Sequence, residues 1–139
     1  MPSNLAKALP LLLGLSSLPT GLLGKSLHPI GEFWSRGAKH DLSVDSDSIK
    51  QVAMLRQFNL HSTFEKPQAR PGHPAFQKLI FAYQVDCMKR AYSVSMISFY
   101  VRVSDDDSAP ESVLSSAPDW TAVDNSEPQA QAIDYVCSR

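Results

Sequence analysis

The sequence lacks the motifs by which most enzyme active sites are recognised. It contains no C-x-x-C pair, no G-x-S-x-G turn around its serines, and no glycine-rich loop of the kind that holds phosphate groups. It has only two cysteines, and its four histidines lack the short helical spacing of metal-ligand pairs: His28, His40, His61 and His73. The sequence therefore predicts no catalytic, cofactor or metal site.

Two groups of residues leave weaker chemical alternatives open. Residues 105–107 and Glu111 carry oxygen ligands that would suit calcium, but the segment lacks the D-x-D-x-D-G pattern and is more typical of a solvated acidic loop. A small hydrolase that uses His40 or Asp86 is the other alternative, and a Cys–His nucleophile would require free cysteines.

Clusters of basic residues are also absent. The formal net charge is -1, and Lys89-Arg90 is the one basic doublet in a chain whose other cations are scattered singly. Nucleic-acid binding relies on clustered phosphate contacts, so a nucleic-acid partner is not expected. With 139 residues, of which 43% are hydrophobic and 19% charged, the composition predicts a single folded domain.

The longest apolar stretch, residues 8–23, is short for a membrane helix, which needs roughly 20 residues. It follows one lysine, Lys7, and prolines interrupt it, a pattern typical of a secretory signal. No A-x-A motif marks the cleavage site, and no cysteine here offers lipoprotein attachment. The alternative is a hydrophobic N-terminal helix kept in the fold. We expect a signal peptide over 1–24, a linker over 25–31, and an exported domain over 32–139 with no stable membrane span in the mature chain.

Export determines what the two cysteines do. Oxidising compartments form and keep disulfides, so Cys87 and Cys137 are expected to pair. Closing a loop of about 50 residues removes on the order of 4 kcal/mol of unfolded-chain entropy. In a cytosolic protein the same residues would be ordinary buried thiols.

Alternating apolar residues predict that most of the domain is β-strand. Strands are expected over residues 32–36, 40–45, 49–60, 76–86 and, after a turn at 88–90, 91–103. A change of parity near Met96-Ile97 predicts either a β-bulge or a strand that is buried on both faces. Arg56 lies on an otherwise apolar strand face, where we expect it either to extend its charged end to solvent or to be paired at the sheet edge. A ligand contact is the alternative. Segments 46–48, 65–74 and 105–118 have the composition of turns or loops.

The C-terminal residues have helical spacing instead. After a short extended segment at Trp120–Val123, Ser126 and Gln129 fit a capping box, and apolar residues follow at Ala130, Ile133, Val136 and Cys137. A helix there would place its apolar stripe on the sheet and bring Cys137 to Cys87. The predicted fold class is α+β, a mainly antiparallel sheet with a C-terminal helix packed on it and tethered by one disulfide.

Several short segments, taken in order, resemble the surface-adhesin protein E family. They are Trp34, Val44-Asp45 with Ser48-Ile49, Asp86-Cys87, Phe99-Tyr100, Trp120-x-x-Val123 and Val136-Cys137. The resemblance covers residues 32–137 and implies an antiparallel sheet with a disulfide-tethered C-terminal helix in an exported protein of Gram-negative bacteria. It implies a periplasmic, cell-surface or secreted location, with host extracellular-matrix or serum proteins, or other envelope proteins, as partners.

The leading functional hypothesis is a non-enzymatic envelope or surface module that binds proteins. Its contacts are expected on an exposed sheet edge and on loops 62–75 and 104–118, because loops on a rigid scaffold usually carry binding residues. The alternative is a periplasmic structural or accessory protein without a host ligand, which would pair its edge strands with itself or with another envelope component.

Overall fold

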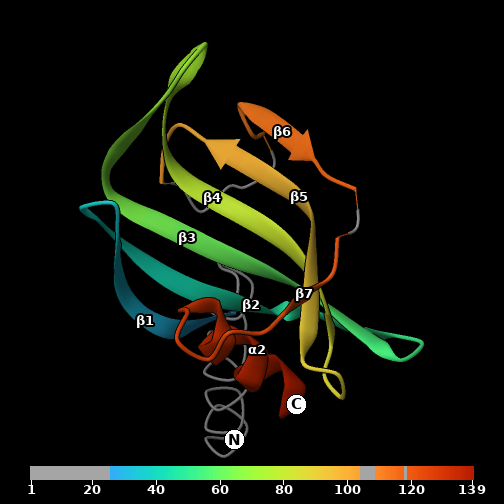
Figure 1. Cartoon of the computed structure of the whole chain (residues 1–139). Helices are drawn as coiled ribbons and strands as arrows, with labels where there is room; N and C mark the ends of the chain where they lie inside the picture. The colour runs from blue at the N-terminus through green and yellow to red at the C-terminus, as the bar shows by residue number, and fades with distance from the viewer. Residues whose placement is uncertain (1–25, 104–108, 118) are drawn as a thin grey trace, which may run out of the picture.

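The computed structural model describes residues 26–103, 109–117 and 119–139. In this part of the chain an antiparallel sheet curves around one C-terminal helix (Figure 1). The strands are β1 (Leu27–Ser35), β2 (Ala38–Val52), β3 (Leu55–Arg70), β4 (His73–Asp86), β5 (Ala91–Tyr100), β6 (Ser112–Ser115) and β7 (Thr121–Ala122), and the helix is α2 (Gln129–Cys137). The predicted fold class is thereby confirmed.

Strands β1 to β6 are neighbours in chain order, and β7 pairs with β5 beside β6. Two-residue turns connect β1 to β2, β2 to β3 and β3 to β4, and each returns the chain antiparallel to the strand it has left. Positive φ angles occur at Arg36 and Gly37 in the first turn, at Ala53 in the second and at Gly72 in the third. The β2–β3 and β3–β4 hairpins project from opposite ends of the sheet in Figure 1.

The predicted strand over residues 49–60 is wrong, because the chain reverses at Ala53 and Met54 between β2 and β3. The even-numbered apolar residues of this stretch do not share one face. Val52 pairs with Leu55 across a two-residue turn, and Leu55 and Phe58 point to opposite faces of β3, so Val52 lies on the face opposite to Phe58. The alternation read across residues 49–60 was therefore false, because the turn inverts its parity.

The predicted turn at 46–48 is part of this bulge and not the end of a strand. The backbone N–H of Asp47 donates to Asp45 Oδ1 at 3.1 Å, and Ser48 Oγ donates to the Asp45 carbonyl at 2.6 Å. The turn-forming residues thus bond locally, as their chemistry predicts, while β2 continues to Val52.

Three segments that were expected to be irregular contain strands. Residues 65–74 form the end of the β3–β4 hairpin, whose pairing is irregular between Thr63 and Arg70, and this irregularity accommodates the prolines. Strand β1 starts at Leu27, within the expected linker. Strand β6 occupies 112–115 of the expected loop 105–118, of which 105–108 and 118 lie outside the described residues.

Strand β4, the turn before β5 and the extended segment near Trp120 agree with the sequence prediction. The expected bulge in β5 is at Ser95, because Ala82 pairs with Met96 and Tyr83 pairs with Val94. The capping box is wrong. Helix α2 has Pro128 at its N-cap, while Ser126 Oγ donates to Asp124 Oδ1 at 2.7 Å in the preceding turn.

The hydrophobic core lies between α2 and one face of β2, β3 and β4. Strict alternation places the sheet side chains of this core on a single face, and the predicted helical stripe packs against them. The core consists of Leu42, Val44, Phe58, Leu60, Tyr83, Val85, Ala132, Ile133 and Val136.

Two connections fix the C-terminal end of α2 on the sheet. A disulfide joins Cys87, directly after β4, to Cys137, with their Cα atoms 5.7 Å apart. Arg56 Nη1 donates to the carbonyls of Val136, at 2.6 Å, and of Arg139. Arg56 is thus paired with the end of the helix from the interior strand β3, not at a sheet edge, which explains why a cation lies beside an apolar face.

Candidate functional site

Helix α2 covers only part of the core face of the sheet. Beyond its N-terminus the same face carries a groove of about 420 Å³, which we call the aromatic groove. The pleat of β2, β3 and β4 aims His40, Phe64 and Phe81 into it. Its complete lining is Trp34, Ser35, His40, Leu42, Leu60, Ser62, Phe64, Leu79, Phe81, Tyr83, Glu127, Pro128 and Gln129.

A row of half-buried rings crosses this end of the sheet from β1 to β5. His40 lies 6.3 Å from Phe33 and stacks on Phe64 at 5.1 Å, and Phe64 meets Phe76 edge-on at 5.7 Å. Phe76 in turn contacts Phe99 at 5.3 Å between ring centroids. Because every ring has neighbours in its own row, the surface is ordered before any partner arrives.

His40 and Ser62 form a hydrogen-bonded pair in the aromatic groove. His40 Nδ1 lies 2.9 Å from Ser62 Oγ. Burial lowers the pKa of His40 below its ordinary value, which favours the neutral imidazole. Ser62 is only 2% exposed, and Asp41 is directed to the opposite face by the pleat, so this pair lacks the accessible nucleophile and the orienting carboxylate of a Ser–His–Asp site.

Asp86, the other residue of the hydrolase alternative, is not brought to His40. Its carboxylate accepts a hydrogen bond at 3.0 Å from the backbone N–H of Lys89 in the β4–β5 turn. His40 pairs with Phe64 near the far end of β3, whereas the last pairs of β3 on the Asp86 side join Arg56 to Val85. The two residues therefore occupy opposite ends of the sheet.

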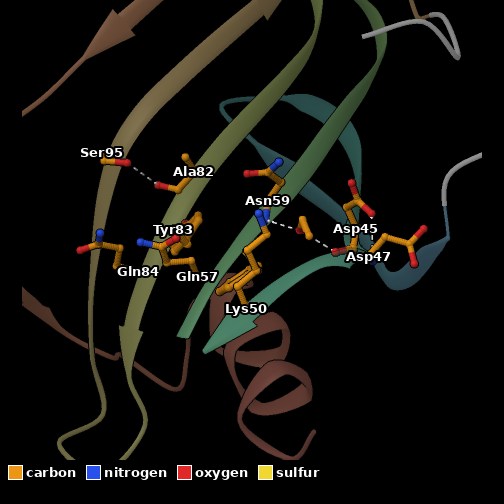
Figure 2. Close-up of a pocket in the computed structure, with 11 residues that line it drawn as sticks. Asp45, Asp47, Lys50, Gln57, Asn59, Ala82, Tyr83, Gln84 and Ser95 are labelled. Carbon is orange, nitrogen blue, oxygen red and sulfur yellow. Dashed lines mark hydrogen bonds between the residues drawn. The ribbon is translucent and has the colours of Figure 1, made fainter. Parts of the chain in front are cut away.

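The opposite face of the sheet holds a second, polar hollow of about 350 Å³ (Figure 2). Cross-strand pairing places Lys50, Gln57 and Gln84 in one row. In the next row Asn59 pairs with Ala82, whose small side chain leaves the space open. The complete lining is Asp45, Asp47, Ser48, Lys50, Gln57, Phe58, Asn59, Ala82, Tyr83, Gln84 and Ser95.

This polar hollow offers hydrogen bonds with little apolar contact. Phe58 and Tyr83 line it from their strands but belong to the core on the other face, where their rings stack 5.1 Å apart. One side of the hollow is shaped by the β2 bulge, in which Ser48 Oγ accepts a hydrogen bond at 2.8 Å from the Asn59 backbone. Such a surface suits a polar ligand, whereas interface cores are rich in aromatic residues.

The histidines do not gather. His28 stacks on Tyr135 of α2 at 3.7 Å, and His73 Nδ1 lies 3.3 Å from Glu111 Oε1. Over residues 26–103, 109–117 and 119–139, no group of three or more His, Cys, Asp or Glu side chains is placed to hold a metal ion. The acidic stretch 105–107 lies outside the described residues.

The expected contact loops and the observed groove differ. Residues 62–75 are parts of two strands and a turn, yet they contribute Ser62 and Phe64 to the aromatic groove. Sequence reasoning missed Phe64 because the proline-rich segment after it was assigned to a loop. The alternation that predicted β4 does include Phe81 and Tyr83, and it was the one sequence pattern that indicated the face of the sheet that carries the groove.

Comparison with protein families gives a match to surface-adhesin protein E over residues 29–138. No curated protein and no solved structure matches the chain. In the portion of the chain that the structure describes, no helix is long and apolar enough to cross a membrane. The matched region contains the disulfide and all the described strands, except for the first residues of β1. The chain therefore belongs to the surface-adhesin protein E family.

Proposed function

We propose that this chain is an exported, non-enzymatic protein-binding module of the bacterial envelope or surface, and that the aromatic groove holds its partner. The observation that carries the proposal is the row of contacting rings beside an open groove on a disulfide-tethered sheet. Membership of the surface-adhesin family supports a surface role.

The composition of the groove suits a protein ligand. Its volume of about 420 Å³ accommodates one or two large side chains, and its lining combines aromatic and aliphatic residues with polar groups such as His40, Glu127 and Gln129. Rigid aromatic residues supply contact area at low entropic cost and are enriched among the residues that dominate interface energies. His40, held in place by Ser62, would then orient a polar group of the partner in the groove.

Host extracellular-matrix and serum proteins are the partners that the family resemblance favours. An envelope partner, or self-association through an edge strand, is the second candidate. It is supported by β6, a short edge strand in which Val113 and Leu114 are 48% and 50% exposed. Exposed strand edges can pair with another chain, and a periplasmic accessory protein would use that property.

The test is binding to a panel of immobilised extracellular-matrix and serum proteins, with two groove variants. Phe64→Ala removes a central ring, and Ser35→Tyr adds bulk at the exposed mouth without touching the core. Met54→Ala is the matched control, because Met54 is 74% exposed at the β2–β3 turn and lies outside the groove. Melting temperatures of all variants establish that they fold.

We expect the wild-type protein to bind at least one member of the panel. Truncating a central aromatic residue typically costs an interface about 1.4 kcal/mol or more, which corresponds to at least a tenfold weaker affinity for Phe64→Ala. Ser35→Tyr should also weaken binding, and Met54→Ala should not. Binding that survives both groove variants contradicts the groove assignment. If the wild-type protein binds no member of the panel, the host-protein role is contradicted.

A further inference from the structure

Another hollow, of about 320 Å³, lies at the β1–β2 turn, and we call it the Trp34 hollow. Trp34 is 72% exposed, an unusual position for the largest apolar side chain. Residues from β3 form the other wall, so the hollow is bounded on two sides. Its lining is Trp34, Arg36, Gly37, Ala38, Lys39, Glu65, Lys66, Pro67 and Gln68.

The turn that carries this hollow holds an arginine in a conformation that costs stability. Arg36 and Gly37 have φ angles of 53° and 77°, and the first of these positions normally takes Asn, Asp or Gly in a two-residue hairpin turn. Arg90 adopts the same backbone conformation with φ 49°, but there the guanidinium bonds Asp134 and Asn125. Arg36 has no such bond among the described residues, so its exposed guanidinium is available to an external group.

The acidic residues near the hollow are already engaged. Lys39 Nζ lies 3.1 Å from Glu32 Oε2 and 3.7 Å from Glu65 Oε2. Its hydrogen bond to Glu32 holds the pKa of Lys39 above the ordinary value, so the amine stays charged. Within the described ranges neither Arg36 nor Lys66 forms an ion pair. These two exposed cations therefore give the hollow a positive end beside an aromatic ring.

We propose that the Trp34 hollow binds an anionic sugar, with the sugar ring against Trp34 and a sulfate or phosphate group between Arg36 and Lys66. A guanidinium donates parallel hydrogen bonds to such an oxyanion, and lysine adds a flexible point charge. The bounded hollow favours a discrete ligand over a flat lipid surface. This inference is independent of protein binding in the aromatic groove, although Trp34 lines both hollows.

The test follows backbone amide NMR shifts of the purified protein during titration with four probes. A sulfated heparin tetrasaccharide and phosphorylated glucose represent the host and bacterial sources of an anionic sugar. Maltotetraose is the neutral control, and vesicles containing anionic phospholipid represent a membrane. Because two exposed cations and one ring make a weak site, we expect a dissociation constant of about 1 mM for at least one anionic sugar.

The variants separate the contributions of ring and charge. Arg36→Gln and Lys66→Gln should each weaken sugar binding about threefold, and both together about tenfold. Trp34→Ala should weaken it about tenfold. Trp120→Ala and Lys89→Gln are matched controls at exposed positions outside the hollow and should leave binding unchanged. Added salt should weaken binding of the anionic sugars.

Three results would overturn the proposal. They are sugar binding that is unchanged in the Arg36→Gln, Lys66→Gln double variant, equal binding of maltotetraose, and binding that requires anionic vesicles while both soluble sugars leave the spectrum unchanged. The last result would make the hollow a membrane contact. Protein binding through the aromatic groove is tested separately, with the Phe64→Ala variant. Either proposal can therefore fail while the other holds.

Discussion

Arg56 shows at the scale of one residue how the sheet holds the end of α2. Its guanidinium donates to the carbonyl oxygen of Val136, in the last turn of the helix, and to that of Arg139, beyond its end. Replacement by glutamine, which is too short to reach them, should lower the free energy of unfolding by about 1–3 kcal/mol. Urea denaturation measures this loss. Lys50→Gln, an exposed change in the neighbouring strand, is the control and should be nearly neutral; equal losses in both would refute this role of Arg56.

The pKa of His40 makes a prediction about pH. Because burial lowers it in the folded protein, folding favours the neutral imidazole. The stability that depends on neutral His40 is complete above its ordinary pKa of about 6.5 and is lost as the pH falls through the lower folded-state value. The His40→Gln variant should therefore lose less unfolding free energy than wild type between about pH 7.5 and about pH 5.5.

An NMR titration of the His40 ring checks this directly. The expected midpoint lies below that of a histidine in a disordered peptide, and a midpoint at or above that value would show that the ring is not desolvated. The His73→Gln variant is the comparison for His40→Gln, since His73 lies at an exposed hairpin end beside Glu111 and outside the aromatic groove.

The candidate site was only partly predictable at this scale. Arg56 stood out because a cation interrupts an apolar strand face, but its partner, the end of α2, was not predicted. The roles of Trp34 and Phe64 depend on which residues face them from other strands. That information lies in the cross-strand register, which bulges in β1, β2 and β3 shift by amounts that local patterns do not encode.

Among the elements, the β2–β3 turn offers a direct test because it uses an alanine at positive φ. Ala53 has φ 55°, a conformation that glycine adopts without steric cost. Ala53→Gly should therefore raise the free energy of unfolding by about 0.5–1 kcal/mol, against the usual effect of glycine. Ala75→Gly, at an exposed position of β4, should lower the free energy of unfolding. A destabilised Ala53→Gly protein, measured by thermal unfolding, would contradict the turn geometry.

The C-terminal helix depends on its tether. Cys87 and Cys137 are 50 residues apart, and a disulfide across such a loop contributes about 4 kcal/mol through the entropy of the unfolded chain. Cys87→Ser and Cys137→Ser should each lower stability by a few kcal/mol, and the double variant should lose no more than either alone. Melting that is unchanged by reductant would disprove this contribution.

Elements were predictable where local chemistry and tertiary packing agree. The alternation of β4, the parity change in β5 and the apolar stripe of α2 each predicted a described feature. The turn at Ala53 and Met54 carries no glycine, proline, asparagine or aspartate, so it has no local signal. The prolines after Phe64 predicted a loop, but irregular pairing in the hairpin accommodates them.

At the scale of the whole molecule, the disulfide, the sheet and the family assignment agree with a protein that works outside the cytoplasm. A domain with a modest core gains much of its stability from one covalent link, and an oxidising compartment is where that link persists. The aromatic groove and the Trp34 hollow then lie on a scaffold that is held rigid at the helix end.

The most direct test of this account is the intact mass of the native protein recovered from fractionated cells, measured with and without reductant and alkylation. We predict a product in the envelope or secreted fraction that lacks the N-terminal segment and has no alkylatable thiol until it is reduced. A full-length cytosolic product with two free thiols would contradict export and the disulfide together, and with them the proposed role at the cell surface.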